Sequence, residues 1–184
     1  MRTFIAVDCN NKEKILHIQQ KILKIFPNFN SSIRPVNIEN LHFTLFFFGD
    51  IENKHLELIS KKMNEIVFEK FEINYRKIGA FPSFKYPKVI WIGVDEESEK
   101  KLSSLFEVVK FKMEQIDFRP DKQFKPHLTI FRIKRPITNI EQYLSKYKDV
   151  SIDFSDLIDK IYIKKSELFS SGPVYSNILT IFAK

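Results

Sequence analysis

The stretch that decides the fold is LHFTLF at residues 41–46, together with a second copy of its pattern, PHLTIF, at residues 126–131. Each copy places a histidine two residues before a threonine, within a run of apolar residues that is typical of a strand. Residues two apart on a strand point to the same face, so each histidine shares a face with its threonine. The four side chains concerned are His42, Thr44, His127 and Thr129.

The chemistry of these side chains favours the handling of a phosphate group. Burying a strand face of histidine and threonine costs free energy, unless that face lines a cleft that contains water. Opening a cyclic phosphodiester needs a base for water and an acid for the departing oxygen. Imidazole titrates near pH ~6.5, so one ring can be neutral while its partner is protonated. Threonine hydroxyls can donate to phosphate oxygens, and we therefore expect the two motifs to face each other across one cleft.

A phosphate group also needs a cation, and Arg132, five residues after His127, is the best candidate. Strict alternation would point Arg132 away from His127, so its participation requires a bulge or a strand end. One His-x-Thr triplet alone carries little weight, because such triplets commonly lie on half-exposed sheet faces. The second copy, in a second apolar strand, is what favours function. His17 and His55 lie on lysine-rich predicted helices, and we expect them to be solvated surface residues.

The rest of the chain alternates between strand and helix patterns. Strands are predicted at residues 3–9, 41–48, 71–81, 88–94, 127–133, 150–154, 160–165 and 175–182, the first with both faces apolar and therefore central in a sheet. Helices are predicted at residues 15–25 (capped by Asn10 or Asn11 and ended by Pro27), 56–66, 95–113 (capped by Asp95) and 138–147 (opened by a capping box of Thr138 and Glu141). These patterns favour an α+β fold with largely antiparallel sheets.

Size and charge set further limits. The 184 residues suit one domain, 1–184, or two small lobes that share a core. A net charge of +7 favours an anionic partner such as nucleic acid, although the lysines are spread along the chain and can reflect genome composition. No window approaches the ~18 apolar residues of a membrane span, and no signal segment opens the chain, so we expect a cytoplasmic protein with no membrane partner.

Motifs for metals and cofactors are missing from the sequence. The lone Cys9 lies in an apolar run and is expected to be a buried strand residue. The chain contains no glycine-rich phosphate loop, no His-Glu-x-x-His and no Cys-x-x-Cys. We therefore expect no cofactor and no metal, with a metal bridged by His42 and His127 as the alternative.

With these residues in view, the chain resembles the two-histidine (2H) phosphoesterase superfamily. Within it, the sequence is most similar to the RNA 2′,3′-cyclic phosphodiesterases, also called 2′-5′ RNA ligases. The similarity covers nearly the whole length, in this order: MRTFIAVD, IRPVNIENLHFTLFFFGDI, IGAFPSFKYPKVIWIGV, FKPHLTIFRIK and SELFSSGPVYSNI.

The resemblance implies a bilobal, pseudo-symmetric fold with a central cleft, and metal-independent hydrolysis of RNA-terminal 2′,3′-cyclic phosphates to 2′-phosphates. It assigns His42 as proton donor and His127 as proton acceptor. The residues it assigns to phosphate binding are Thr44, Thr129 and Arg132. Two positions depart from the family pattern: Lys125 replaces a frequent arginine before Pro-His, and Phe46 occupies a position that is often lysine or small. We expect Phe46 to share the face of Thr44.

Two alternative functions stay open at this point. The same site could form a 2′-5′ RNA bond by the reverse reaction, or the fold could serve as a non-catalytic module that binds RNA ends or nucleotides. The expected substrates are RNA ends or small cyclic nucleotides, and the expected state is a monomer. An RNA path could run along Phe118, Phe124, Phe131, Arg119, Lys122 and Lys125, although the phenylalanines are equally well explained as core residues and the cations as solvated ones.

Overall fold

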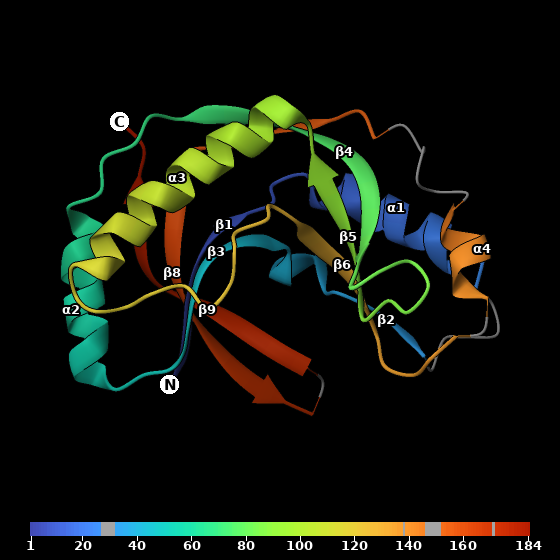
Figure 1. The fold of residues 1–184 in the computed structure, drawn as a ribbon, viewed down its shortest axis with the longest axis horizontal. Helices are drawn as coiled ribbons and strands as arrows, with labels where there is room; N and C mark the ends of the chain where they lie inside the picture. Colours follow the sequence, from blue (N-terminus) through green and yellow to red (C-terminus); the bar gives the residue numbers. More distant parts are fainter. Residues whose placement is uncertain (27–31, 138, 146–151, 171) are drawn as a thin grey trace.

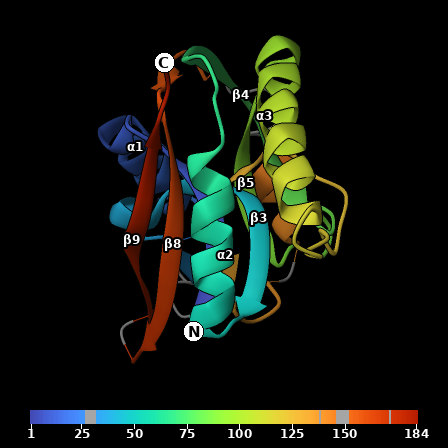
Figure 2. The same ribbon diagram turned by 90° about the vertical axis from the view of Figure 1, so that its left-hand side faces the viewer.

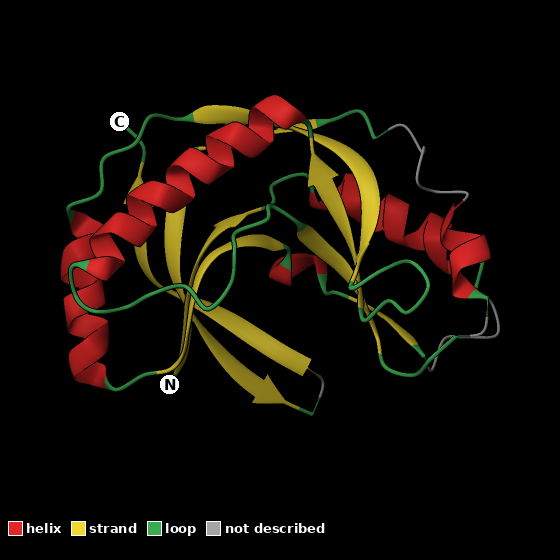
Figure 3. Cartoon of the chain, viewed as in Figure 1, coloured by secondary structure: helices red, strands yellow, loops and turns green. Residues whose placement is uncertain are grey.

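The computed structural model describes residues 1–26, 32–137, 139–145, 152–170 and 172–184. Two antiparallel sheets stand side by side, with the longer helices at the periphery (Figures 1 and 3). The first sheet has the order β3-β1-β8-β9 and the second has the order β2-β6-β5-β4-β7. The α+β fold with antiparallel sheets predicted from the sequence is therefore confirmed.

The strands of the first sheet are β1 (Arg2–Asp8), β3 (His42–Asp50), β8 (Lys160–Phe169) and β9 (Gly172–Phe182). Those of the second are β2 (Ile33–Pro35), β4 (Phe71–Phe81), β5 (Val89–Val94), β6 (Leu128–Ile133) and β7 (Ser155–Ile158). The helices are α1 (Lys12–Leu23), the 3-10 turn η1 (Ile38–Asn40), α2 (Asn53–Asn64), α3 (Glu96–Glu114) and α4 (Ile140–Ser145). Each motif strand thus belongs to a different sheet.

Helices packed across the two halves tie the sheets together. α1 follows β1 of the first sheet but packs on β6 of the second, and α3 follows β5 of the second sheet but contacts β3 of the first as well as β4. α2 and α3 run side by side (Figure 2). As predicted, β1 is a central strand with five consecutive buried residues, and Cys9 beyond it is fully buried. Burial raises the pKa of the Cys9 thiol to about 12, which keeps it protonated.

A buried polar cluster fastens the end of β1 to the second sheet. The carboxylate of Asp156, on β7, accepts hydrogen bonds from the Tyr75 hydroxyl (2.8 Å) and the Asn10 backbone N–H (2.9 Å). Asn11 takes the predicted cap position of α1, but its side chain donates to the Ser155 carbonyl (2.6 Å) instead of capping the helix. The start of α1 is therefore held from the other half of the molecule. Asp95 caps α3 as predicted, accepting from the Ser98 N–H at 2.8 Å.

One local prediction was wrong, and one short strand was not predicted. The strand predicted at residues 150–154 is instead β7, four residues long, which pairs with residues 71–74 of β4. The apolar alternation around Ile152 fits several registers, and the edge offered by β4 selects one of them. The short edge strand β2 was not predicted, because three residues ending in Pro35 carry no periodic signal. The predicted positions Pro27, Thr138 and Tyr147, and residues 150 and 151, lie outside the described residues.

The feature of the fold that shapes the cleft is a β-bulge in each motif strand. In the pairing of β3 with β1, Leu45 is an extra residue between Thr44 and Phe46. In the pairing of β6 with β5, Ile130 is an extra residue between Thr129 and Phe131. Both extra residues lie three positions after the motif histidine. A bulge of this kind reverses the alternation of the residues that follow it. Among the described residues, no helix has the length and apolar character needed to cross a membrane.

Candidate active site

His42 begins β3, and its ring is fixed by two hydrogen bonds. Nδ1 lies 2.7 Å from the Asn40 carbonyl oxygen, and Nε2 lies 3.1 Å from the Thr44 hydroxyl. A carbonyl can only accept, so Nδ1 carries the proton, and Nε2 of the neutral ring accepts from Thr44. The rings of Phe4 (4.9 Å between centroids) and Tyr175 (5.3 Å) pack against the imidazole. The ring therefore presents one basic nitrogen beside a hydroxyl.

His127, immediately before β6, repeats this arrangement in the second sheet. Its Nδ1 donates to the carbonyl oxygen of Lys125 at 2.7 Å, again two residues earlier in the chain. Nε2 of the neutral ring is thereby left as an acceptor. The edge-on ring of Phe81 lies 4.9 Å away between centroids and limits the orientations that the imidazole can adopt. The two motifs thus hold both imidazoles in the same tautomer.

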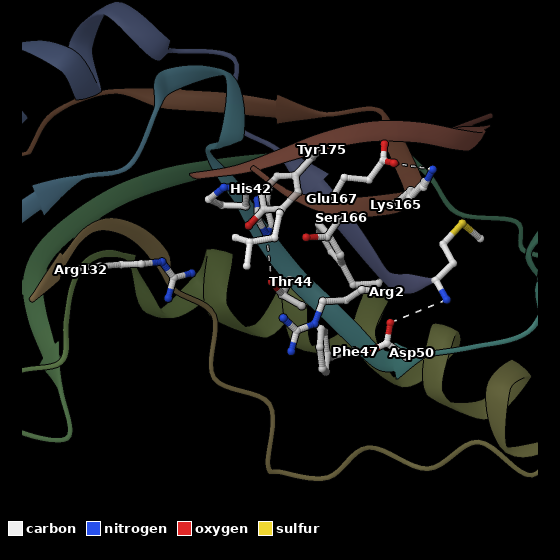
Figure 4. Close-up of a pocket in the computed structure, with 14 residues that line it drawn as sticks. Arg2, His42, Thr44, Phe47, Asp50, Arg132, Lys165, Ser166, Glu167 and Tyr175 are labelled. Atoms are coloured by element: carbon white, nitrogen blue, oxygen red, sulfur yellow. Dashed lines mark hydrogen bonds and ion pairs between the residues drawn. The ribbon is translucent and has the colours of Figure 1, made fainter. Parts of the chain in front are cut away.

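The bulge at Ile130 resolves the orientation of Arg132. Thr129 lies opposite Trp91, and Arg132 lies opposite Val89. These partners are two residues apart in β5, with Ile90 between them, whereas Thr129 and Arg132 are three residues apart in β6. Arg132 consequently lies on the face of Thr129, as the sequence argument required. Its side chain is exposed, and Figure 4 shows it extending toward His42 and Thr44 from the opposite side of the cavity.

A single cavity collects every residue predicted for the site. Its volume is about 980 Å³, within the range of ~300–1,000 Å³ that is usual for ligand pockets. The predicted residues that line it are His42, Thr44, His127, Thr129 and Arg132. Arg34, Lys88, Lys134 and Tyr175 line it as well and were not singled out in the sequence, where nothing distinguishes these cations from the other lysines and arginines. A second cavity, of about 820 Å³, shares His42, Thr44, Arg132 and Tyr175 with the first and is also lined by Arg2 and Phe47 (Figure 4).

Burial and the positive charges around the cleft keep both rings neutral. Burial, with a smaller contribution from the charges of Lys164 and Arg132, lowers the pKa of His42 to about 4 against the opposing hydrogen bond to Asn40. Burial also lowers the pKa of His127, as do the charges of Lys125 and Arg132. At pH 7 the cleft therefore holds two neutral imidazoles close to several cations. Such a site favours an anion, and a bound anion would raise both pKa values.

Several predictions about neighbouring residues need correction. Phe46 is buried and does not share the face of Thr44, because the bulge at Leu45 turns Phe47 to that face instead. Lys125 places its ammonium group 5.4 Å from the Phe81 ring centroid and 5.5 Å from that of Trp91, beside His127. His55 is half-buried against Phe118 rather than solvated, whereas His17 is exposed as predicted.

The aromatic residues suggested for an RNA path belong to the core. Phe131 is fully buried, Phe124 stacks on Phe106 with 4.6 Å between centroids, and Phe118 packs against Phe48. Arg119 and Lys122 are exposed, and neither lines the two cavities beside His42. In the described part of the chain, no group of three His, Cys, Asp or Glu side chains is arranged to hold a metal ion.

The position of Arg132 can be tested without a substrate. Replacing Arg132 with alanine removes a positive charge that lowers the pKa of both histidines, so both values should rise. The side chain is exposed, so the fold should be unaffected. The measurement is an NMR titration of the imidazole nitrogens, with the exposed Arg135→Ala as a matched control that should leave both values in place. Unchanged titration of both rings in Arg132→Ala would mean that the guanidinium lies away from the cleft.

Comparison with known proteins agrees with the internal repeat. The family described as LigT like Phosphoesterase matches residues 10–91 and again residues 92–175, so each match contains one of the two motifs. A protein of Archaeoglobus fulgidus named RNA 2′,3′-cyclic phosphodiesterase is 36% identical over 180 residues, which cover 97% of this chain and 98% of the relative. A protein of the same name from Methanothermobacter thermautotrophicus is 30% identical over 184 residues, covering 97% of this chain and 96% of the relative.

Solved structures show the same fold at lower sequence identity. The crystal structure of a Thermus thermophilus protein superposes with a TM-score of 0.79 at 24% identity, covering 99% of this chain and 97% of that one. Escherichia coli LigT complexed with 3′-AMP superposes with a TM-score of 0.78 at 19% identity, with the same coverage. The family match over most of the sequence and the relatives of 30% identity or more establish that the chain belongs to the LigT-like phosphoesterase family.

Proposed function

We propose that this protein hydrolyses RNA-terminal 2′,3′-cyclic phosphates to 2′-phosphates, with His42 as the proton donor and His127 as the base. The observation that carries the proposal is the matched pair of imidazoles in one cavity. Each ring donates from Nδ1 to the carbonyl two residues before it, which leaves both Nε2 atoms for substrate, and Arg132 lines the same cavity. The shared name of the relatives supports this substrate class.

In the proposed reaction, a single displacement opens the cyclic phosphate. Nε2 of His127 takes a proton from water, and the water oxygen attacks phosphorus in line with the 3′ oxygen. The P–O3′ bond breaks, and Nε2–H of His42 gives its proton to the departing oxygen. Arg132 and the hydroxyls of Thr44 and Thr129 hold the non-bridging oxygens, where negative charge is concentrated. The products are a 2′-phosphate and a free 3′ hydroxyl, so every atom and proton is accounted for.

The substrate itself supplies the charge that makes His42 an acid. In the free protein the pKa of His42 is about 4, so the ring is neutral at pH 7. The anionic phosphate enters next to Nε2 and raises that pKa, since an opposite charge within a few ångströms favours the protonated ring. Thr44 Oγ1, 3.1 Å from Nε2, can then accept from the protonated ring instead of donating to it.

Ligation, with a 5′ hydroxyl in place of water as the nucleophile, is a second candidate, favoured by the shape of the cavity. The cavity that contains His127 extends to Arg34, Lys88 and Lys134, a basic surface larger than an attacking water requires. A 5′ hydroxyl of a second RNA strand could take the place of water, with its phosphates on these cations. Supplying an RNA with a 5′ hydroxyl would then yield a joined product with a 2′-5′ linkage. A purely binding function needs no such matched acid and base.

The direct assay uses a short RNA that ends in a 2′,3′-cyclic phosphate, incubated with the protein in EDTA. We expect complete conversion to the 2′-phosphate, because the proposed chemistry uses only protein side chains. Products are resolved by the position of the terminal phosphate. Loss of turnover on chelation that a divalent ion restores would replace this mechanism with a metal site at His42 and His127. A 3′-phosphate product would mean that the 2′ oxygen departs instead of the 3′ oxygen.

The pH dependence tests the electrostatics of the cleft. The productive free protein has His42 protonated and His127 neutral. The pKa of His42 is about 4 and that of His127 is below 6.5, so kcat/KM should follow a bell whose maximum lies on the acid side of pH 6.5 and should fall as the pH rises through neutrality. kcat, which reports the complex, should persist to higher pH because the bound phosphate raises both pKa values. A kcat/KM optimum on the alkaline side of the kcat optimum would contradict these assignments.

A further inference from the structure

The helix α1 contains a buried amide side chain within its apolar stripe. α1 packs against β6 (Figure 1) and buries the side chains of Ile15, Gln19 and Ile22, with Gln19 only 2% exposed. Burying an amide costs free energy unless its hydrogen bonds are made, and an apolar side chain would fill the same space without that cost. The hydrogen bonds of Gln19 therefore indicate what this residue secures in the fold.

The Gln19 amide donates to two backbone carbonyls beside the cleft. Its Nε2 atom lies 2.8 Å from the carbonyl oxygen of Ile130, on β6, and 2.9 Å from that of Val36, the first residue after β2. A carbonyl can only accept, and the amide nitrogen carries two protons, so one N–H is available for each carbonyl. Gln19 therefore joins α1 both to β6 and to the segment that follows β2.

The carbonyl of Ile130 belongs to the extra residue of the bulge in β6. In addition to the Gln19 amide, its oxygen accepts the Val36 N–H at 2.9 Å, so both of its lone pairs are used. These two donors fix the peptide plane between Ile130 and Phe131 from outside the pairing of β6 with β5. Arg132 follows two residues after Ile130, so the direction of its side chain depends on the conformation that is fixed here.

We propose that Gln19 is a positioning residue, which holds the bulge of β6 in the conformation that turns Arg132 toward the phosphate. This inference rests on the proposed function, in which Arg132 holds the non-bridging oxygens, and adds to it a residue that acts through the backbone of β6. Gln19 lies in the wall of the cavity that Thr129 and Arg132 line. A helix that follows β1 of the first sheet thereby sets the phosphate-binding geometry of the second.

The test is a double-mutant cycle of Gln19→Met and Arg132→Ala, measured as kcat/KM on a short RNA that ends in a 2′,3′-cyclic phosphate. Methionine is unbranched like glutamine but has no N–H to donate. Gln19→Met should lower kcat/KM about 10-fold to 100-fold, since a misplacement of ~1 Å can cost a factor of 100. In the Arg132→Ala background the same replacement should change kcat/KM little, because no guanidinium is left to orient.

The matched control is Gln20→Met, because Gln20 is the next residue of α1 and its side chain is exposed. This variant should keep the activity of its parent in both backgrounds. A loss of equal size in both backgrounds for Gln19→Met, or no loss in either, would overturn the positioning role. If Gln19→Met fails to fold, as judged by circular dichroism, Gln19→Asn provides the same comparison with an amide that is one methylene too short to reach both carbonyls.

An NMR titration of the imidazole nitrogens separates this inference from the proposed function, because it needs no substrate. If the guanidinium turns away from the cleft, its charge moves away from both rings, and Gln19→Met should raise the pKa of His42 and of His127 in the direction expected for Arg132→Ala. Failure of the parent protein to turn over the RNA would refute the proposed function alone. Unchanged titration of both rings in Gln19→Met would refute the role of Gln19.

Discussion

An extra residue three positions after the histidine of each motif strand determines which side chains meet in the cleft. Regular alternation would give each strand a histidine and a threonine on one face and send the residue five positions after the histidine to the other. The bulges at Leu45 and Ile130 bring that residue back. Arg132 and Phe47 face the cavities for this reason, while Phe46, which regular alternation would expose, is packed in the core. β6 lies between β2 and β5, and β3 pairs with β1 at the edge of its sheet. A slip of either bulge would move apolar residues out of the core.

The electrostatics of the cleft depend on the same geometry. Arg132, turned inward by its bulge, adds its charge to burial in lowering the pKa of both histidines. Each ring is held by a carbonyl oxygen at its Nδ1 atom, so neither can leave the tautomer in which Nε2 faces the cleft. The free site is therefore a preorganised positive cavity with two neutral bases. In the mechanism that we propose, binding of an anionic phosphate converts one of them into an acid, which couples proton transfer to the presence of substrate.

Much of this arrangement could be predicted from the sequence because its signals are local. The two motifs, the buried first strand, the Asp95 cap and the need for a bulge before Arg132 all follow from short-range patterns or from the charge that a phosphate requires. β7 could not be placed, since its register is chosen by the edge of β4. Phe47 could not be distinguished from Phe46 either. A phosphate site requires a cation, and this requirement indicated the bulge that turns Arg132 toward the cleft. Nothing in the sequence required the corresponding residue of the other strand to be aromatic.

The central claim is that the two imidazoles act as a unit with different roles, and a change of leaving group tests it most directly. In a substrate whose 3′ oxygen is replaced by sulfur, the departing group needs no proton. The variants His42→Ala and His127→Ala should each lose at least ~100-fold in kcat/KM on the oxygen substrate, as is typical for removal of a general acid or base. On the sulfur substrate, His42→Ala should recover most of its activity and His127→Ala should stay impaired. Recovery of His127→Ala alone would exchange the two roles, and full activity of either variant on the oxygen substrate would contradict the acid–base pair.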